Sequence, residues 1–173
     1  MIDSRVDRAS DLPAALGRLD AGMHISARIE YALRALCTLA ARAGEPLTAE
    51  ELAEAQGLPV RFLRAILNDL RRVGIVTSQR GNEGGYKLAR PASEITVGDV
   101  FRRLEGPLAE VRGMRPESAS YEADAMHLQK VWVAVRACLR GVLDEVTLEQ
   151  VVSGKLPNQI LRLVSSPGAW EPH

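Results

Sequence analysis

The chain has 173 residues, of which 46% are hydrophobic and 25% charged, and its formal net charge is zero. This composition is typical of a globular protein of one modest domain, or of a small domain with an appendage. No apolar run is long enough to span a membrane and the N-terminus lacks the apolar core of a signal peptide, so we expect a cytoplasmic protein without a membrane partner. The two cysteines, Cys37 and Cys138, form no CxxC motif, which argues against a structural zinc site or a disulfide framework.

The N-terminal part predicts an extension followed by a helix. Residues 1–22 show no sustained apolar pattern and contain proline and glycine, so we expect a mostly disordered extension there. A helix is expected from about Ser26 to residue 43, because Ser26 is a good N-cap and apolar residues then recur at helical spacing.

The next two segments predict a helix-turn-helix. Thr48 and Glu51 have the spacing of a capping box, which predicts a short helix over residues 49–56 that ends at Gly57. Pro59 suits the first turn of a second helix, whose inner face carries apolar residues at helical spacing up to Val73. Two helices joined by a tight glycine-containing turn are typical of this motif.

A β-hairpin is predicted directly after it. Residues 75–78 and 86–88 have strand character, and a polar glycine-rich turn over residues 80–85 separates them. The predicted fold class is therefore mostly α with a small β-hairpin wing: a winged helix-turn-helix domain over residues 23–91.

The C-terminal part predicts a long helix suited to dimerisation. Thr96 and Asp99 cap a short helix that ends near Leu104, residues 105–122 form a loop, and a long helix runs over about residues 122–145. We expect part of this helix to cover the winged domain and the rest to pack against a second copy. Its apolar stripe has spacings of three and four residues and contains Leu128, Val131, Trp132, Val135, Leu139 and Val142. Residues 92–152 are thus interpreted as linker helix, loop and dimerisation helix. Residues 153–173 are interpreted as a C-terminal tail with a possible short helix over residues 158–165.

The charge distribution favours a nucleic-acid partner. Residues 59–90 contain seven basic residues and only two acidic ones, although the whole chain is neutral. DNA binding needs a local basic face rather than a basic protein, but the same charges also suit a solvated helix face. In a helix-turn-helix the start of the second helix enters the major groove. Its outward-facing residues here are Pro59, Arg61, Arg64 and Asn68.

The wing predicts a second DNA contact. Arg80 lies at the base of the glycine-rich turn and suits a phosphate or a narrow minor groove. Gly81, Gly84 and Gly85 allow the backbone to approach a duplex closely.

Several motifs resemble those of the Rrf2 family of bacterial regulators. They are Met-His-Ile-Ser-x-x-x-x-Tyr-Ala-Leu-Arg-Ala-Leu (residues 23–36), Leu-Arg-x-x-Gly-Ile-Val (70–76), Arg-Gly-x-x-Gly-Gly-Tyr-x-Leu (80–88), Ile-Thr-Val-Gly-Asp-Val (95–100), Leu-Glu-Gly-Pro (104–107) and Val-Thr-Leu-Glu (146–149). The resemblance covers about residues 23–152. It implies a transcriptional regulator that acts as a homodimer, in which the long helix joins the two copies and the paired winged helices read a palindromic double-stranded DNA operator. We expect repression as the output, with activation left open by the sequence. The DNA contacts that it implies are Pro59, Arg61, Phe62, Arg64, Ser78 and Arg80, with Ser26 and Tyr31 at phosphate-contacting positions of the first helix.

The resemblance also bears on cofactors. Many relatives bind an iron–sulfur cluster through cysteines in the loop before the long helix, but residues 105–127 contain no cysteine here. Clusters need thiolates or close substitutes, so we expect no cofactor and no metal. Within the family, the chain is most similar to the cluster-free branch of cysteine-metabolism repressors. His24, His127 and Glu30 are interpreted as surface residues.

Three alternatives stay open at this point. Cys37 and Cys138 are interpreted as packed residues, but either could serve a thiol-based redox sensor. The domain could be a winged-helix protein-interaction module that does not bind DNA. The signal could come from a small-molecule effector or a metabolic enzyme partner. An enzyme is not expected, because no acid–base or nucleophile constellation is present.

Overall fold

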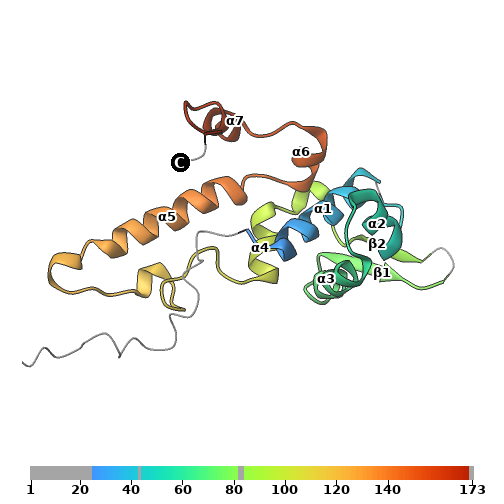
Figure 1. Ribbon diagram of the computed structural model, residues 1–173, viewed down its shortest axis with the longest axis horizontal. Coiled ribbons are helices and arrows are strands. Elements are labelled where there is room, and N and C mark those ends of the chain that lie inside the picture. The colour runs from blue at the N-terminus through green and yellow to red at the C-terminus, as the bar shows by residue number, and fades with distance from the viewer. Residues whose placement is uncertain (1–24, 43, 82–83, 172–173) are drawn as a thin grey trace, which may run out of the picture.

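The computed structural model describes residues 25–42, 44–81 and 84–171. A winged-helix body lies at one end of the molecule and a long helical arm extends from it (Figure 1). The predicted N-terminal extension, residues 1–22, lies outside the described residues, as do Asn82 and Glu83 of the predicted turn. None of the described helices combines the length and the apolar character needed to cross a membrane.

Three helices form the centre of the body: α1 (Ala27–Ala41), α2 (Ala49–Gln56) and α3 (Val60–Arg72). The hydroxyl of Ser26 accepts a hydrogen bond from the Ile29 N–H, which confirms the predicted N-cap. Thr48 and Glu51 form the predicted capping box, and Gly57 ends α2 in the left-handed conformation. Pro59 occupies the position before α3 rather than its first turn, so that detail of the prediction was wrong by one residue.

The core joins these helices to segments from later in the chain. Side chains that are fully or almost fully buried come from all three helices and from beyond them: Leu36, Leu52, Leu63, Leu67, Leu70, Ile75, Ile95 and Leu148. Burying one such side chain stabilises a fold by about 1.5–3 kcal/mol, so this cluster is a major source of the stability of the body. Leu148 begins α6 (Leu148–Ser153), which packs against α1 although more than 100 residues separate them.

The predicted wing is present as an antiparallel hairpin. Strand β1 (Val76–Gln79) pairs with β2 (Gly85–Leu88). Leu47, in the loop between α1 and α2, exchanges two backbone hydrogen bonds of 2.9 and 2.7 Å with Tyr86. This bridge fixes the hairpin to the helical body.

The segment between body and arm is more structured than the predicted loop. A 3₁₀ turn, η2 (Ala92–Glu94), leads into α4 (Val97–Leu104), which Thr96 caps as predicted. Two further 3₁₀ turns follow, η3 (Pro116–Ser118) and η4 (Ala123–Ala125), before α5 (Leu128–Leu143). The predicted start of the long helix near residue 122 was wrong, because Ala123 has a φ of 47° and a left-handed residue cannot continue an α-helix.

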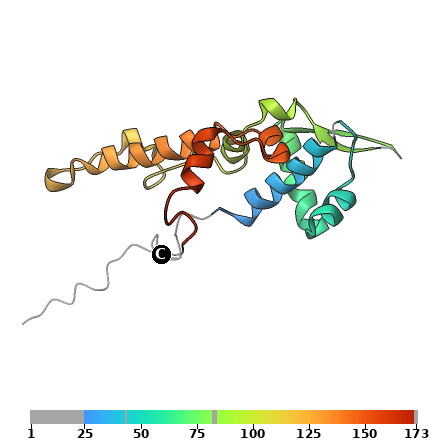
Figure 2. The same ribbon diagram turned by 90° about the horizontal axis from the view of Figure 1, so that it is seen from above.

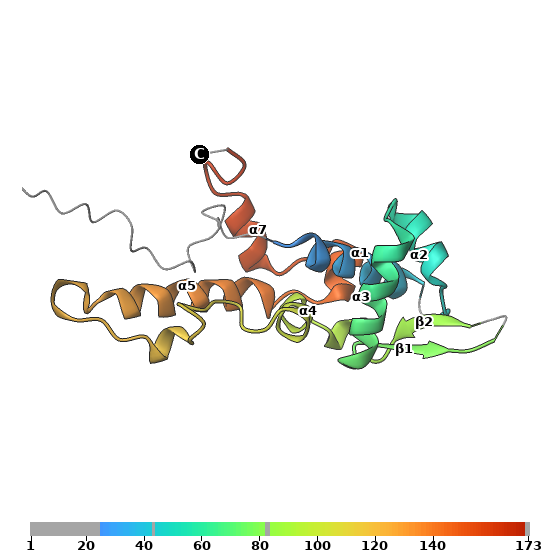
Figure 3. The ribbon, with the colours of Figure 1, turned by 60° about the horizontal axis from the view of Figure 1, so that its bottom comes forward.

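Helix α5 forms an exposed arm. It projects away from the body beside the linker that contains η3, as the three views show (Figures 1, 2 and 3). In the described chain no residue of α5 is buried, and Val131 is 50% exposed. Only its C-terminal half approaches the body, where Leu139 and Leu143 share a hollow with Phe101 of α4. The stripe therefore covers less of the body than expected. The final helix, α7 (Asn158–Val164), matches the short helix predicted in the tail.

Candidate nucleic-acid interface

The start of α3 and the wing lie around one hollow of the surface. Residues from α2, from α3 and from both strands of the wing line it: Thr48, Ala49, Glu50, Arg64, Asn68, Gln79, Gly81, Gly84, Gly85 and Tyr86. The structure thus brings Arg64 of the predicted recognition helix together with the predicted wing glycines. Arg61 and Arg80 are also exposed. Arg61 lies in α3, three residues before Arg64, and Arg80 directly follows the last paired residue of β1.

An aromatic pair supports the start of α3. Phe62, in the first turn of α3, is 46% exposed. Its ring meets the half-buried ring of Tyr31 edge to face, with centroids 5.8 Å apart and an interplanar angle of 89°. An exposed phenylalanine at this position suits an apolar contact with a thymine methyl group, and Tyr31 holds it in place.

Several predicted contact residues also have structural roles. The hydroxyl of Ser26 caps α1 and donates a hydrogen bond to the Glu105 carboxylate. Ser78 accepts a hydrogen bond of 3.3 Å from the Arg71 guanidinium. Either hydroxyl can exchange its partner for a phosphate, so these two positions stay predictions.

The wing glycines have a folding explanation. A Cβ on Gly85 would lie 2.6 Å from the backbone carbon and oxygen of Leu47, which is closer than any real contact. A Cβ on Gly84 would lie 2.5 Å from the Gln79 carbonyl oxygen, and Gly81 has a φ of 112°. The Gly-x-x-Gly-Gly spacing therefore builds the wing itself, independently of any approach to DNA.

Glu50 is a residue of this face that the sequence analysis missed. It lies in the first turn of α2 and forms an ion pair with Arg64 of α3 across the hollow. Its own backbone N–H at the helix start and the Arg64 guanidinium both lower the pKa of the Glu50 carboxyl, which is therefore charged at neutral pH. Glu50 follows a recognisable capping residue, but only the packing of α2 against α3 places it beside Arg64.

Replacing Glu50 with glutamine is expected to tighten binding to DNA of any sequence. The substitution removes a negative charge from the face that is predicted to meet phosphates, and it frees the Arg64 guanidinium from its ion pair. Affinity should rise several-fold in a mobility-shift titration at low salt. Glu54→Gln, which removes an exposed charge from the far end of α2, serves as the matched control and should leave affinity nearly unchanged. An E50Q variant that binds no more tightly than the control would show that this hollow does not face DNA.

Comparisons with known proteins identify the family. The family model described as "Rrf2: Iron-dependent Transcriptional regulator" matches residues 25–154. The chain belongs to the Rrf2 family. The Mycobacterium tuberculosis protein Rv1287, whose name describes an HTH-type transcriptional regulator, is 45% identical over 150 residues, covering 86% of this chain and 93% of that protein. The HTH-type transcriptional regulator CymR of Bacillus subtilis is 33% identical over 132 residues, covering 76% of this chain and 91% of CymR.

Solved structures agree with this assignment. The structure of CymR, described as the global cysteine regulator of B. subtilis, has a TM-score of 0.66 and 34% identity, covering 77% of this chain and 98% of CymR. The T. potens IscR structure has a TM-score of 0.63 and 33% identity, covering 78% of this chain and 89% of IscR. The predicted winged-helix fold is confirmed. This Rrf2 protein is a DNA-binding transcriptional regulator, and its family consists of regulators rather than enzymes.

The iron dependence in the family description does not fit the residues of this Rrf2 regulator. Among the described residues, no group of three or more His, Cys, Asp or Glu side chains is placed to hold a metal ion. Cys37 lies half-buried in α1 and Cys138 lies on α5, in an apolar hollow of the arm. An iron–sulfur cluster needs several thiolates or close substitutes gathered around it, and the linker before α5 contains no cysteine.

The two thiols differ in their surroundings. Burial raises the pKa of the Cys37 thiol, which keeps it protonated and slow to react, as expected for a packed cysteine. Cys138 is exposed in this chain, so its interpretation as a packed residue is wrong for the single chain.

Proposed function

We propose that this Rrf2 regulator is a homodimeric repressor that binds a palindromic operator without an iron–sulfur cluster. The observation that carries the proposal is the hollow that α3 and the wing share, with exposed arginines around it. A separate apolar stripe on α5, which the described chain leaves uncovered, supports the dimer. Where the palindrome overlaps the promoter, a bound dimer excludes RNA polymerase, and repression is the output that we propose. The proposed DNA contacts are Ser26, Tyr31, Pro59, Arg61, Phe62, Arg64, Ser78, Arg80, Gly81, Gly84 and Gly85.

The surface of α5 supports the dimer. One face of the arm carries an almost wholly apolar hollow lined by Val131, Ala134, Val135, Cys138, Leu139, Val142 and Leu143. Leu128 and Trp132 continue the stripe and are 40% and 36% exposed. A helix with an apolar stripe at three- and four-residue spacing is stabilised by a second helix of the same kind, and a twofold axis supplies one. Two winged bodies held in this way can meet half-sites in successive turns of the major groove.

The test of the proposed function is a mobility-shift and footprinting experiment on the DNA upstream of the chain's own gene. We expect a dimer to protect a palindromic segment, with at least a hundredfold preference over a scrambled sequence at the same salt concentration. Equal affinity for both sequences, or no binding to either, would favour the alternative of a winged-helix module that binds another protein.

Replacing Arg80 with alanine is expected to weaken binding to specific and non-specific DNA alike. Arg80 is exposed directly after β1 and makes no ion pair with a described residue, so its charge is available to a phosphate. The loss of one phosphate contact per protomer should reduce the slope of log affinity against log salt by about one unit for each half-site. Arg162→Ala removes the same charge from α7, which lies away from the wing (Figures 1 and 3), and should change neither quantity. An unchanged slope for R80A excludes Arg80 from the interface.

A further inference from the structure

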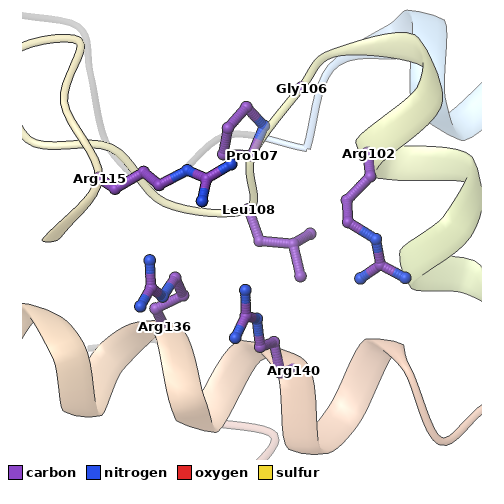
Figure 4. A pocket seen from close by; sticks show the side chains of 7 residues that line it. All are labelled: Arg102, Gly106, Pro107, Leu108, Arg115, Arg136 and Arg140. Carbon is purple, nitrogen blue, oxygen red and sulfur yellow. The ribbon is translucent and has the colours of Figure 1, made fainter. Parts of the chain in front are cut away.

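Four arginine side chains converge on a pocket between α4, the linker and α5 (Figure 4). Arg102 comes from α4, Arg115 from the linker, and Arg136 and Arg140 from successive turns of α5. Gly106, Pro107 and Leu108 complete the lining of this pocket, which has a volume of about 260 Å³ and is called here the arginine pocket. The wing lies at one end of the molecule and the pocket lies nearer its middle, between α4 and α5 (Figure 1), and none of the four arginines is among the proposed DNA contacts.

The charges around the arginine pocket are not balanced. Arg136, whose side chain is only 12% exposed, pairs with Glu117. Arg102 pairs with Asp99 and Asp144. Arg115 lies close enough to Glu117 for its charge to help lower the pKa of that carboxyl, but neither Arg115 nor Arg140 forms an ion pair with a residue that the structure describes. Figure 4 shows the guanidinium groups of both turned toward the pocket. Positive charges gathered around a partly enclosed space repel one another, and a bound anion removes this cost.

We propose that the arginine pocket binds a small organic oxyanion, either a phosphate ester or a molecule with two or more carboxylates. The planar guanidinium fork donates paired hydrogen bonds to either group, and two forks from different elements can hold one doubly charged anion. The volume suits a metabolite rather than a peptide or a nucleic-acid strand. Pro107 and Leu108 provide an apolar wall for the carbon skeleton of the ligand.

The position of the arginine pocket gives the ligand a regulatory effect. The anion would contact α4, which packs on the winged body, and α5, which carries the proposed dimer surface. A ligand that bridges the two fixes the angle between body and arm, and in the dimer that angle sets the distance between the two recognition helices. This regulatory part rests on the proposed function, whereas binding of the anion does not.

Binding is tested by calorimetry on the full chain with inorganic phosphate, pyrophosphate and citrate, at constant ionic strength maintained with sodium chloride. We expect saturable binding of at least one of them, weakened about tenfold or more in Arg115→Gln and in Arg140→Gln. Neither substitution leaves a carboxylate without its partner, and thermal unfolding checks that each variant is folded. Lys130→Gln, an exposed residue of α5 outside the pocket, is the control with the same loss of charge and should bind as the native chain does.

The three anions used in the calorimetry distinguish the two proposed ligand classes. Binding of phosphate or pyrophosphate alone identifies a phosphate ester as the ligand class, and binding of citrate alone identifies a polycarboxylate. No saturable binding of any probe, or equal losses in K130Q and in the two arginine variants, overturns the proposal. A mobility-shift titration with and without the bound anion then tests regulation, where at least a threefold change in operator affinity is expected. Anion binding by a chain that recognises no operator would refute the proposed function and leave the pocket intact.

Discussion

Replacing Val135 with glutamate is expected to convert the dimer into monomers and to abolish operator binding at concentrations where the native chain binds fully. Val135 lies in the apolar hollow of α5, away from the hollow that α5 shares with α4. In the proposed dimer the variant buries two unpaired carboxylates at the seam, each at a cost of about 3 kcal/mol or more. The dissociation constant of the dimer should therefore rise by more than about a hundredfold. Sedimentation or light scattering at micromolar concentration measures this change.

Ala137→Glu is the matched control for this experiment. Ala137 is an exposed residue of the same helix outside the apolar hollow, so the added charge stays in water. This variant should remain dimeric and bind DNA as the native chain does. A native chain that is monomeric at micromolar concentration contradicts the proposed assembly, and a V135E variant that stays dimeric shows that another surface forms the seam.

Replacing Gly85 with alanine is expected to displace the wing and to reduce operator binding at least tenfold. The new Cβ would lie 2.6 Å from the Leu47 backbone, so the two hydrogen bonds between Leu47 and Tyr86 must lengthen or break. Overpacking and the loss of two backbone hydrogen bonds together reduce the free energy of unfolding by roughly 2–4 kcal/mol. Thermal denaturation measures the loss of stability, and a mobility-shift titration at a temperature where the variant is folded measures the loss of affinity.

Gly141→Ala provides a control of opposite sign. Gly141 lies inside α5, and a Cβ there would meet no described atom within 4 Å. Alanine is favoured over glycine in a helix by about 1 kcal/mol, so this variant should be slightly more stable than the native chain. If G85A unfolds at the same temperature as the native chain, the close approach of Leu47 does not require glycine and the wing is held by other contacts.

The sequence by itself determined the local elements of this protein. The caps at Ser26, Thr48 and Thr96 and the stop at Gly57 lie where they were predicted, because a cap depends on hydrogen bonds between residues three or four positions apart. The two strands of the wing were predicted to within one residue, because the glycine-rich turn marks the reversal of the chain. Together with the family motifs, these local signals were sufficient to assign a winged-helix regulator.

Only the tertiary structure decided which distant residues meet. The left-handed Ala123 delays the start of α5, although nothing in its own sequence excludes a helix. The pairing of Glu50 with Arg64 and the convergence of Arg102, Arg115, Arg136 and Arg140 each depend on how separate elements pack. Hydrophobic periodicity predicts which face of a helix is buried but not the element that covers it. The reason is that the free energy of hydrophobic burial depends on the apolar area removed from water, and hardly on which element covers that area. The proposed interface and the arginine pocket therefore follow from packing, and the helices that carry them follow from the sequence.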